Sequence, residues 1–412
     1  MNFGATTTMH IRPILSTLLR HKIAAALIVL EIAITFAIVC NAIFLIAGRV
    51  ARANESSGMA EPELLRIQLA GFGARAGAGA VAQTTLDLSV LRALPGVKHA
   101  TVANQVPFGN SSTNSSIALP ADVDHEIVSV STYFGGEDFI ATTGVKLIAG
   151  RDFTAGEYLD AKDAIEREPH AFIPAVILNR ATAEKVFHGG QAVGKTIHIY
   201  GTLTTVVGVI DELIRPNRSG RPQSMVLPLR ATYMTGNYLL RVDPAQRDAV
   251  LKAAVAALDQ AGPGRVVQAQ QRYDTLRDNY FQQDYTMAML LAAVCAALLV
   301  VTALGIVGLA SFWVQQRTRM IGTRRALGAT RGQIMRYFQT ENLLLTGIGI
   351  VLGMAGSYAI NQLLMTHYEL ARLPAWYLPI GALLLIVLGQ LAVFGPARRA
   401  AALPPVVVMR GA

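Results

Sequence analysis

The chain has 412 residues, of which 52% are hydrophobic, with a mean hydropathy of +0.40 and a formal net charge of +9. This hydropathy is high for a soluble protein and favours a membrane protein. The basic residues concentrate in short segments beside apolar runs, so no nucleic-acid partner is expected. Two cysteines exclude a disulfide framework, and eight histidines without metal-ligand spacing give no sign of a metal or enzyme site.

The chain opens with a short basic segment, residues 1–22, which we expect to lie at the cytoplasmic surface as an amphipathic stretch. The apolar run over 23–48 then predicts a first transmembrane helix. This run is longer than the core of a signal peptide, about 7–15 residues, so it is expected to remain as an uncleaved anchor. Later runs predict further transmembrane helices over 286–314, 338–366 and 374–394. Cys40 and Cys295 fall inside predicted spans, where they act as small apolar residues.

The charge distribution predicts which segments face the cytoplasm. Residues 1–22, 315–337 and 395–412 together hold twelve Lys and Arg and no Asp or Glu. Because basic loops stay in the cytoplasm, both termini and the 315–337 loop are expected inside. Residues 49–285 and the short turn 367–373 are then expected outside.

The outer segment is long enough for an independently folded domain, and its pattern repeats. Strand, helix and strand are expected over 63–69, 84–94 and 97–106, and again over 238–242, 244–260 and 265–270. Two such units on one sheet form a split, ferredoxin-like lobe, over about 60–130 and 225–272.

A second lobe, about 130–225, is expected to be inserted between these halves. Its pattern predicts a strand over 174–178, a helix over 180–187 and a hairpin over 196–210. Gly-rich and Ser-rich runs over 71–79 and 110–116 predict loops. A polar, helix-compatible stalk over 273–285 leads into the second span. The fold class is therefore a membrane α-helical protein with four transmembrane helices in a 1+3 arrangement and a large α+β extracytoplasmic domain of two lobes.

Residues 189–196, GGQAVGKT, match the phosphate-binding expression GxxxxGK[ST]. A phosphate-binding loop follows a strand and precedes a helix, so that backbone amides and the helix N-terminus hold the phosphates. Here a helical segment comes before the motif and β-branched residues follow it. The sequence therefore predicts a turn into a strand at this point.

The basic loop between the second and third spans has helical spacing, with apolar residues between its arginines over 317–337. Such a helix at the cytoplasmic surface suits membrane lipid or a partner protein. In this loop the chain resembles the MacB/FtsX-like family of ABC transporter permeases. The pattern R-x-x-x-IG-x-R-x-A-x-GA is matched by Arg317, Ile321, Gly322, Arg324, Ala326, Gly328 and Ala329.

The resemblance extends over nearly the whole chain. A Glu at the start of the third span and a Gly-rich span are matched by Glu341, Gly347, Gly349, Gly353 and Gly356. In the outer domain, residues 175–210 resemble the periplasmic core signature, and GVKLIAGRDFT at 144–154 resembles the element before it.

The resemblance implies a dimer of permeases, as a homodimer or a paralogous heterodimer, and a cytoplasmic ATPase gripping the loop helix. Residues 1–22 are too short for a fused ATPase, so a separate subunit is expected to bind ATP and Mg, while this chain binds no cofactor and is not an enzyme. The residues expected to couple to that ATPase are Arg317, Arg319, Ile321, Gly322, Arg324, Arg325, Leu327, Gly328 and Arg331.

Polar and small residues inside the spans are further candidates. Glu31 lies within the first span, where an acid is either functional or simply partnered in the helix bundle. Glu341 is expected to pair with a loop arginine, such as Arg324 or Arg336. Gly349 and Gly353 form a GxxxG face that suits close packing within the chain or between two copies.

The function that we expect is that of a permease subunit in the bacterial inner membrane, transmitting ATP-driven motion to the outer domain through the 273–284 lever. Export of drugs, peptides or toxins is the favoured role, with a periplasmic adaptor and an outer-membrane channel as possible further partners. Lipoprotein extraction and regulation of the cell envelope remain alternatives within this family. A membrane receptor that senses a ligand is an alternative of another class.

Overall fold

The computed structural model describes residues 22–71, 78–123, 125–166, 171–216, 222–234, 236–368 and 372–402. The predicted amphipathic segment before Lys22 lies outside the described residues. So does the part of the predicted tail that follows Ala402. The chain divides into two compact units, residues 1–53 with 283–412 and residues 54–282.

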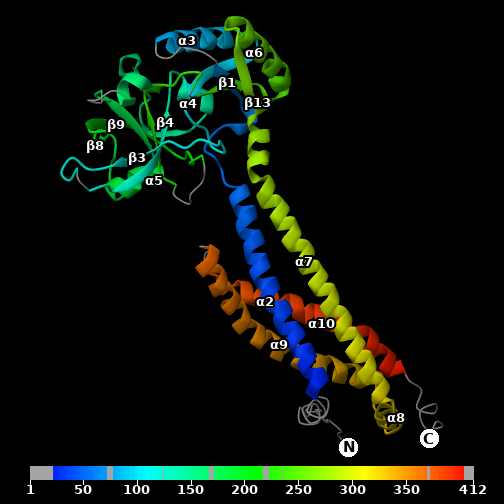
Figure 1. Ribbon diagram of the computed structural model, residues 1–412. Helices are drawn as coiled ribbons and strands as arrows, with labels where there is room; N and C mark the ends of the chain where they lie inside the picture. Colours follow the sequence, from blue (N-terminus) through cyan, green and yellow to red (C-terminus); the bar gives the residue numbers. More distant parts are fainter. Residues whose placement is uncertain are drawn as a thin grey trace, which may run out of the picture. The chain divides into compact units, whose positions relative to one another are not determined.

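The unit made of residues 1–53 and 283–412, called the helical unit below, contains long helices (Figure 1). Among the described residues, four helices are long and apolar enough to cross a membrane: α2 (Lys22–Ala53), α7 (Tyr273–Gln316), α9 (Arg331–Tyr368) and α10 (Tyr377–Ala402). The short α8 (Thr318–Ala326) connects α7 to α9. These helices contain the first three predicted spans in full, while α10 begins three residues after the predicted start at 374. The predicted stalk and second span form one continuous helix, α7.

The core of this unit lies where α2, α9 and α10 pack together, around Ile32, Phe36 and Leu385. Glycines on α9 and α10 allow the close approach. A Cβ at Gly353 would lie 2.8 Å from the Ala33 carbonyl oxygen, and one at Gly381 would clash with Cys40 Sγ. The helix α7 contacts α2 through a 2.8 Å hydrogen bond between the Thr35 and Thr302 hydroxyls.

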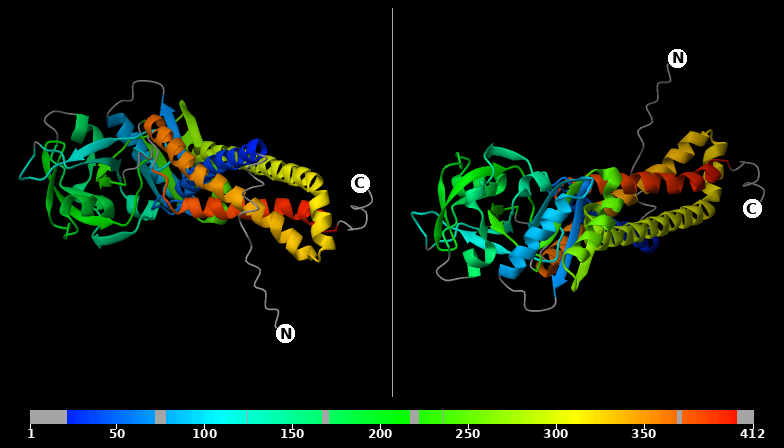
Figure 2. Two further views of the ribbon diagram at one scale, coloured as in Figure 1. Left: turned by 90° about the horizontal axis from the view of Figure 1, so that it is seen from below. Right: turned by 90° about the horizontal axis from the view of Figure 1, so that it is seen from above.

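The unit of residues 54–282, called the outer unit below, has two lobes. Its first lobe is built on a sheet with the strand order β13-β1-β12-β2. Its strands are β1 (Leu64–Gly71), β2 (Val97–Ala103), β12 (Asn237–Val242) and β13 (Arg265–Arg272). Neighbouring strands are antiparallel, which makes β1 and β2 parallel with β12 between them. The helices α3 (Ala78–Arg92) and α6 (Arg247–Ala261) lie side by side on one face (Figures 1 and 2). This is the predicted split lobe.

A buried polar cluster fixes α3 to this sheet. The Asp87 carboxylate is fully buried and accepts hydrogen bonds from the Arg265 guanidinium and the Tyr238 hydroxyl. Its charge is balanced by Arg265, which also lies over the Tyr233 ring at 5.1 Å. Since a buried charge is costly unless it is paired, the pair locks α3, β12 and β13 into one arrangement.

The second lobe is built on a mixed sheet with the order β3-β4-β10-β7-β9-β5, and β8 pairs with β9. Its strands are β3 (Asn114–Ile117), β4 (Val128–Phe134), β5 (Leu147–Gly150), β7 (Ala175–Asn179), β8 (Thr196–Ile199), β9 (Thr202–Ile210) and β10 (Ser224–Leu227). A small parallel pair joins β6 (Leu159–Asp160) to β11 (Leu229–Arg230). The shorter helices of the unit are α4 (Phe139–Thr143), α5 (Arg180–Phe187), η1 (Glu61–Glu63), η2 (Ala155–Glu157), η3 (Lys162–Glu166) and η4 (Pro244–Gln246).

The second sheet extends further along the chain than the predicted 130–225, because β3 pairs with β4. The Ser-rich run 110–116 therefore ends in a strand. The predicted hairpin over 196–210 is present as β8 and β9, which meet at Tyr200 and Gly201, both with positive φ.

Candidate functional site

The predicted coupling loop is a short helical hairpin. Its first helix, α8, ends at Ala326, and the chain turns at Gly328, whose φ of 98° favours glycine. The start of α9 is fixed by a capping box, in which the Gln333 amide donates to Thr330 Oγ1 and the Thr330 amide donates to Gln333 Oε1. Ile321, Ile334 and Phe338 pack between the two arms. The predicted helix over 317–337 is thus α8 and the first turns of α9.

A buried ion pair closes the base of this hairpin. Arg317 Nη1 donates to both carboxylate oxygens of Glu341, at 2.7 and 2.9 Å. The two side chains are 8% and 1% exposed, and the Arg317 guanidinium lies 5.3 Å from the centre of the Trp313 ring. The expected pairing of Glu341 with a loop arginine is confirmed, but that arginine is Arg317 and neither Arg324 nor Arg336. Removal of either charge would leave the other buried and uncompensated.

The predicted coupling residues divide into three groups by burial. Arg317, Ile321 and Gly322 are buried and support the hairpin from within. Arg324 and Arg325 are half-buried: Arg324 lies over the Tyr337 ring at 5.1 Å, and Arg325 donates to the Ala401 carbonyl at 3.1 Å. The exposed members are Arg319, Leu327, Gly328 and Arg331.

Those exposed members form a surface that we call the tip, residues Arg319, Leu327, Gly328 and Arg331. Leu327 is 84% exposed although it is a large apolar residue. An exposed leucine beside arginines is suited to contact with a partner protein, because it offers apolar surface within a charged rim.

The polar and glycine candidates within the spans lie between helices of the same chain. Glu31 on α2 lies against Gly305 of α7, where a Cβ would approach its carboxylate oxygen to 2.6 Å. No ion pair of Glu31 is present among the described residues, so its role stays a prediction. Gly349 and Gly353 pack on α2, where their Cβ positions lie within 2.8 Å of Ile32 and Phe36. Their face therefore serves packing within the chain.

At the N-terminal end of α7, aromatic rings and an ion pair hold the helix to residues of the outer unit. The Tyr273 hydroxyl donates to the Pro107 carbonyl at 2.7 Å, and the Phe108 ring packs on Tyr273, Tyr280 and Phe281. Phe108 has a φ of 64°, which is uncommon for a residue with a side chain. We call this cluster, with Arg277, the α7 socket.

Arg277 completes the socket. Its guanidinium donates to both carboxylate oxygens of Glu61, at 2.7 and 2.9 Å, and lies 5.2 Å from the centre of the Phe108 ring. Both of these bonds come from Nη1, and charge-assisted hydrogen bonds of this kind are stronger than neutral ones. The beginning of α7 is thus anchored to two separate segments of the outer unit, around Glu61 and around Phe108.

The segment that carries Phe108 also reaches the second lobe. Gln105 is fully buried and donates from Nε2 to Ser131 Oγ at 2.9 Å and to the Thr132 carbonyl at 3.0 Å. Asn104 accepts from the Phe134 amide at 2.8 Å. Because these residues follow β2 of the first lobe and bind β4 of the second, the socket is in contact with a segment that ties both lobes together.

The phosphate-binding expression at 189–196 lies in the predicted turn. It follows α5, whose N-cap Asn179 accepts from the Thr182 amide at 3.0 Å, and it leads into β8. Lys195 lies over the Phe187 ring at 4.8 Å. The helix-turn-strand order does not present a helix N-terminus to a phosphate. Across the described residues, no group of three or more His, Cys, Asp or Glu side chains is placed to hold a metal ion.

Comparison with known proteins decides the family. Residues 28–261, more than half of the chain, match the model of the MacB-like periplasmic core domain, and residues 292–405 match that of the FtsX-like permease C-terminal region. The chain belongs to the MacB-like family. It is an ABC transporter permease of the MacB/FtsX type, as the loop motif indicated.

Members of the family with moderate similarity include a macrolide export ATP-binding/permease protein MacB from Chromobacterium violaceum, 28% identical over 69% of this chain and 43% of that protein. A second MacB, from Neisseria gonorrhoeae, is 25% identical over 85% of this chain and 52% of its own length. The chain thus spans about half the length of these MacB relatives. The ABC transporter permease YknZ of Bacillus subtilis is 26% identical over 69% of this chain and 71% of that protein.

Two solved structures, of a MacB and of a YknZ, align with about half of the chain. The periplasmic region of MacB from Actinobacillus actinomycetemcomitans aligns at 15% identity with a TM-score of 0.34, covering 55% of this chain and 97% of the other. The extracellular domain of YknZ aligns at 17% identity with a TM-score of 0.33, covering 50% of this chain and all of the other.

The α7 socket of this MacB-like chain contains residues that the sequence patterns did not single out. Phe108, Glu61 and Arg277 come from three separate segments, and their meeting in the socket depends on tertiary structure. The pairing of Arg317 with Glu341 did leave a signal, since the two residues lie the same number of positions before and after Ala329 in the turn. In a helical hairpin, residues at equal distances from the turn face each other.

Proposed function

We propose that this permease transmits motion from a separate cytoplasmic ATPase to its outer domain, and that the transmitted motion drives export of drugs, peptides or toxins. In this proposal the chain lies in the bacterial inner membrane, with both termini and residues 315–337 in the cytoplasm. The ATPase binds ATP and Mg, and a second permease copy completes the transporter. The name of the MacB relatives, macrolide export proteins, supports export over the other roles of the family.

The observation that carries the proposal is the continuous helix α7. Its first turns are anchored to the outer unit by the Tyr273 hydrogen bond and the Arg277–Glu61 pair. Its last residues lead directly into Arg317, which is locked to Glu341 at the base of the hairpin. A helix fixed by buried contacts at both ends transmits displacement better than a loop, because its backbone hydrogen bonds resist bending.

The tip is the surface that we propose for contact with the ATPase. Arg319, Leu327 and Arg331 are exposed there, while Ile321 and Arg317 hold the hairpin rigid from inside. Charged and apolar groups on a rigid support suit a tight protein contact, since little conformational freedom is lost on binding. A periplasmic adaptor and an outer-membrane channel are further proposed partners of the outer domain.

The test is purification of the tagged chain from its native membrane in mild detergent. We expect an ATPase with a phosphate-binding loop to copurify and to hydrolyse ATP. Leu327→Asp with Arg331→Glu is expected to reduce the copurified ATPase at least fivefold, because the apolar anchor and one tip charge are lost. Arg398→Glu with Arg399→Asp changes exposed residues of α10 and is the matched control.

Copurification that is equal for the tip variant and the control would contradict the tip as the docking surface. If no ATPase copurifies with any variant, and a ligand of the outer domain instead changes signalling inside the cell, the transporter proposal is wrong. The chain would then act as a ligand-sensing membrane receptor.

A further inference from the structure

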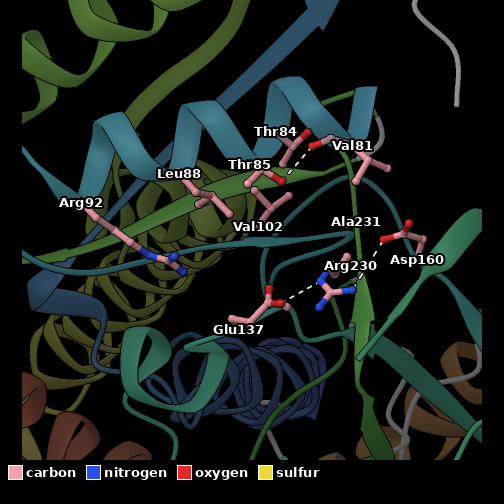
Figure 3. Close-up of a pocket in the computed structure, with 11 residues that line it drawn as sticks. Val81, Thr84, Thr85, Leu88, Arg92, Val102, Glu137, Asp160, Arg230 and Ala231 are labelled. Carbon is pink, nitrogen blue, oxygen red and sulfur yellow. Dashed lines mark hydrogen bonds and ion pairs between the residues drawn. The ribbon is translucent and has the colours of Figure 1, made fainter. Parts of the chain in front are cut away.

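A cleft of about 480 Å³ in the outer unit is lined by charged groups that already have partners (Figure 3). Arg230 forms ion pairs with Glu137 at 2.7 Å and with Asp160 at 3.8 Å. Arg92 is paired with Asp138 at 3.1 Å. These charges are balanced within the fold, so they do not select a ligand.

A second cavity, of about 10 Å³, lies among the helices at the base of the hairpin. Helices α2, α7, α9 and α10 all contribute to its wall, which is mostly apolar and includes Ile306 and Val393. The polar residues of the wall are Trp313, Glu341 and Asn342. A water molecule needs about 10–15 Å³ of such space, so the cavity has room for about one water.

Two N–H groups of this wall are buried, since Trp313 is 4% exposed and Asn342 is 7% exposed. Within the described ranges of the chain, neither Trp313 Nε1 nor Asn342 Nδ2 has a hydrogen-bond partner. Each of these nitrogens can only donate. A buried donor without an acceptor is costly, and most costly where lipid excludes bulk water. Both N–H groups therefore require an acceptor in or beside the cavity.

Gly389 on α10 leaves space beside the Asn342 amide. A Cβ at this position would lie 3.1 Å from Asn342 Nδ2 and 3.2 Å from Thr346 Oγ1, which is closer than most contacts of a Cβ atom. Thr346 is 1% exposed, and its hydroxyl likewise has no hydrogen-bond partner in the part of the chain that the structure describes. The glycine therefore keeps open a space that borders two buried polar side chains.

The same cavity also offers an acceptor. Glu341 is 1% exposed, and its two oxygens accept from Arg317 Nη1 at 2.7 and 2.9 Å. A carboxylate has about four lone-pair positions, so each oxygen can accept a further hydrogen bond. A ligand of the cavity thus meets both N–H donors and a carboxylate acceptor. An anion would be repelled by the carboxylate and a cation by the N–H dipoles, whereas a water molecule can both accept and donate.

We propose that this cavity binds one water molecule, which accepts hydrogen bonds from Trp313 Nε1 and Asn342 Nδ2 and donates one to the Glu341 carboxylate. About three bonds are usual for a buried water. A water-mediated bond is nearly as favourable as a direct one, so the site adds a second polar link between α7 and α9 beside the Arg317–Glu341 pair. The inference concerns the packing of this chain and does not depend on the export proposed above.

The test observes the indole N–H of Trp313 directly. Trp313 and Trp376 are the two tryptophans of the chain, so Trp376→Phe leaves Trp313 as the single indole. Trp376 is 58% exposed, and phenylalanine keeps an aromatic ring at its position. In dodecyl maltoside micelles, which contain no tryptophan, ultraviolet resonance Raman spectra report whether the indole N–H is hydrogen-bonded. We expect a hydrogen-bonded N–H in this single-tryptophan chain.

Filling the cavity is expected to abolish that bond. In the single-tryptophan chain, Ala310→Val enlarges a side chain of the wall without changing a polar group, and Asn342→Leu fills the cavity from α9. The matched control is Asn342→Ala, which also removes the amide but leaves room for the water, so that the N–H stays bonded. Circular dichroism and gel filtration establish that each variant folds, and either filling variant decides the test if the other does not fold.

A free indole N–H in the single-tryptophan chain would overturn the proposal. So would a bond that persists in a folded filling variant, because the acceptor would then lie outside the cavity. Loss of the bond in Asn342→Ala as well as in Asn342→Leu would also overturn it, since the acceptor would then be the Asn342 side chain itself.

Discussion

At the scale of single residues, the Arg317–Glu341 pair is the contact on which the cytoplasmic hairpin depends. Both side chains are more than nine-tenths buried, and Arg317 Nη1 bonds to both carboxylate oxygens of Glu341. Breaking such a pair by removing one partner typically costs about 3–5 kcal/mol, whereas replacing both partners with apolar residues is often neutral. The pair therefore specifies how α8 and α9 meet more than it adds to stability.

Glu341→Gln and Arg317→Met are each expected to lower the thermal unfolding midpoint of the detergent-solubilised chain, since each leaves a buried group without its partner. The double variant Arg317→Met with Glu341→Leu is expected to lie closer to the unmodified chain than either single variant. Arg336→Met, an exposed arginine on α9, is the control and should change little. A double variant as unstable as the sum of the two singles would show that the residues act independently.

Residue by residue, the sequence predicted that Glu341 pairs with a loop arginine and did not identify that arginine as Arg317. The identity of that arginine depends on the hairpin, whereas the sequence pattern predicted one helix within 317–337. The turn at Gly328 and the capping box at Thr330 break that helix. Both are local signals, whereas the socket of Phe108, Tyr273 and Arg277 depends on contacts between distant segments.

At the scale of elements, α7 is the helix that we propose transmits motion from the hairpin to the outer unit. Gln283→Pro places a proline in an exposed position within this helix, where it removes a backbone hydrogen bond and kinks the chain, at a cost of about 3 kcal/mol. We expect the variant to retain its ATPase partner, because the tip is unchanged, and to lose export measured as efflux from cells. Gln283→Ala keeps the helix and is the control. Export by the proline variant at the level of the alanine variant would rule out α7 as the transmitting element.

Most strands and helices of the outer unit were predicted from local patterns in the sequence. The repeated strand-helix-strand units predicted the first lobe, because alternating and helical apolar periods occur there on either side of clear turn signals. The strand β3 was missed since its sequence, Asn-Ser-Ser-Ile, has the composition of a loop, and it becomes a strand by pairing with β4. Pairing of this kind overrides weak local preference, which is why the extent of the second lobe was underestimated.

At the scale of the whole molecule, the account requires that the outer unit and the hairpin lie on opposite sides of a membrane. The charge distribution supports this arrangement, since the segments around the hairpin are basic and free of acids. The same rule predicts that both termini lie on the side of the hairpin. If the arrangement were reversed, the tip could not meet the cytoplasmic ATPase proposed as its partner.

Labelling with a membrane-impermeant maleimide tests this arrangement most directly. In a background carrying Cys40→Ala and Cys295→Ala, a single cysteine is introduced by Glu184→Cys on α5 or by Thr323→Cys on α8, both at exposed positions. The account predicts that the Glu184→Cys chain is labelled in cells whose outer membrane alone is permeable, and that the Thr323→Cys chain is labelled only after the inner membrane is opened. Labelling of the Thr323→Cys chain from outside, or protection of the Glu184→Cys chain until the inner membrane is opened, would contradict it.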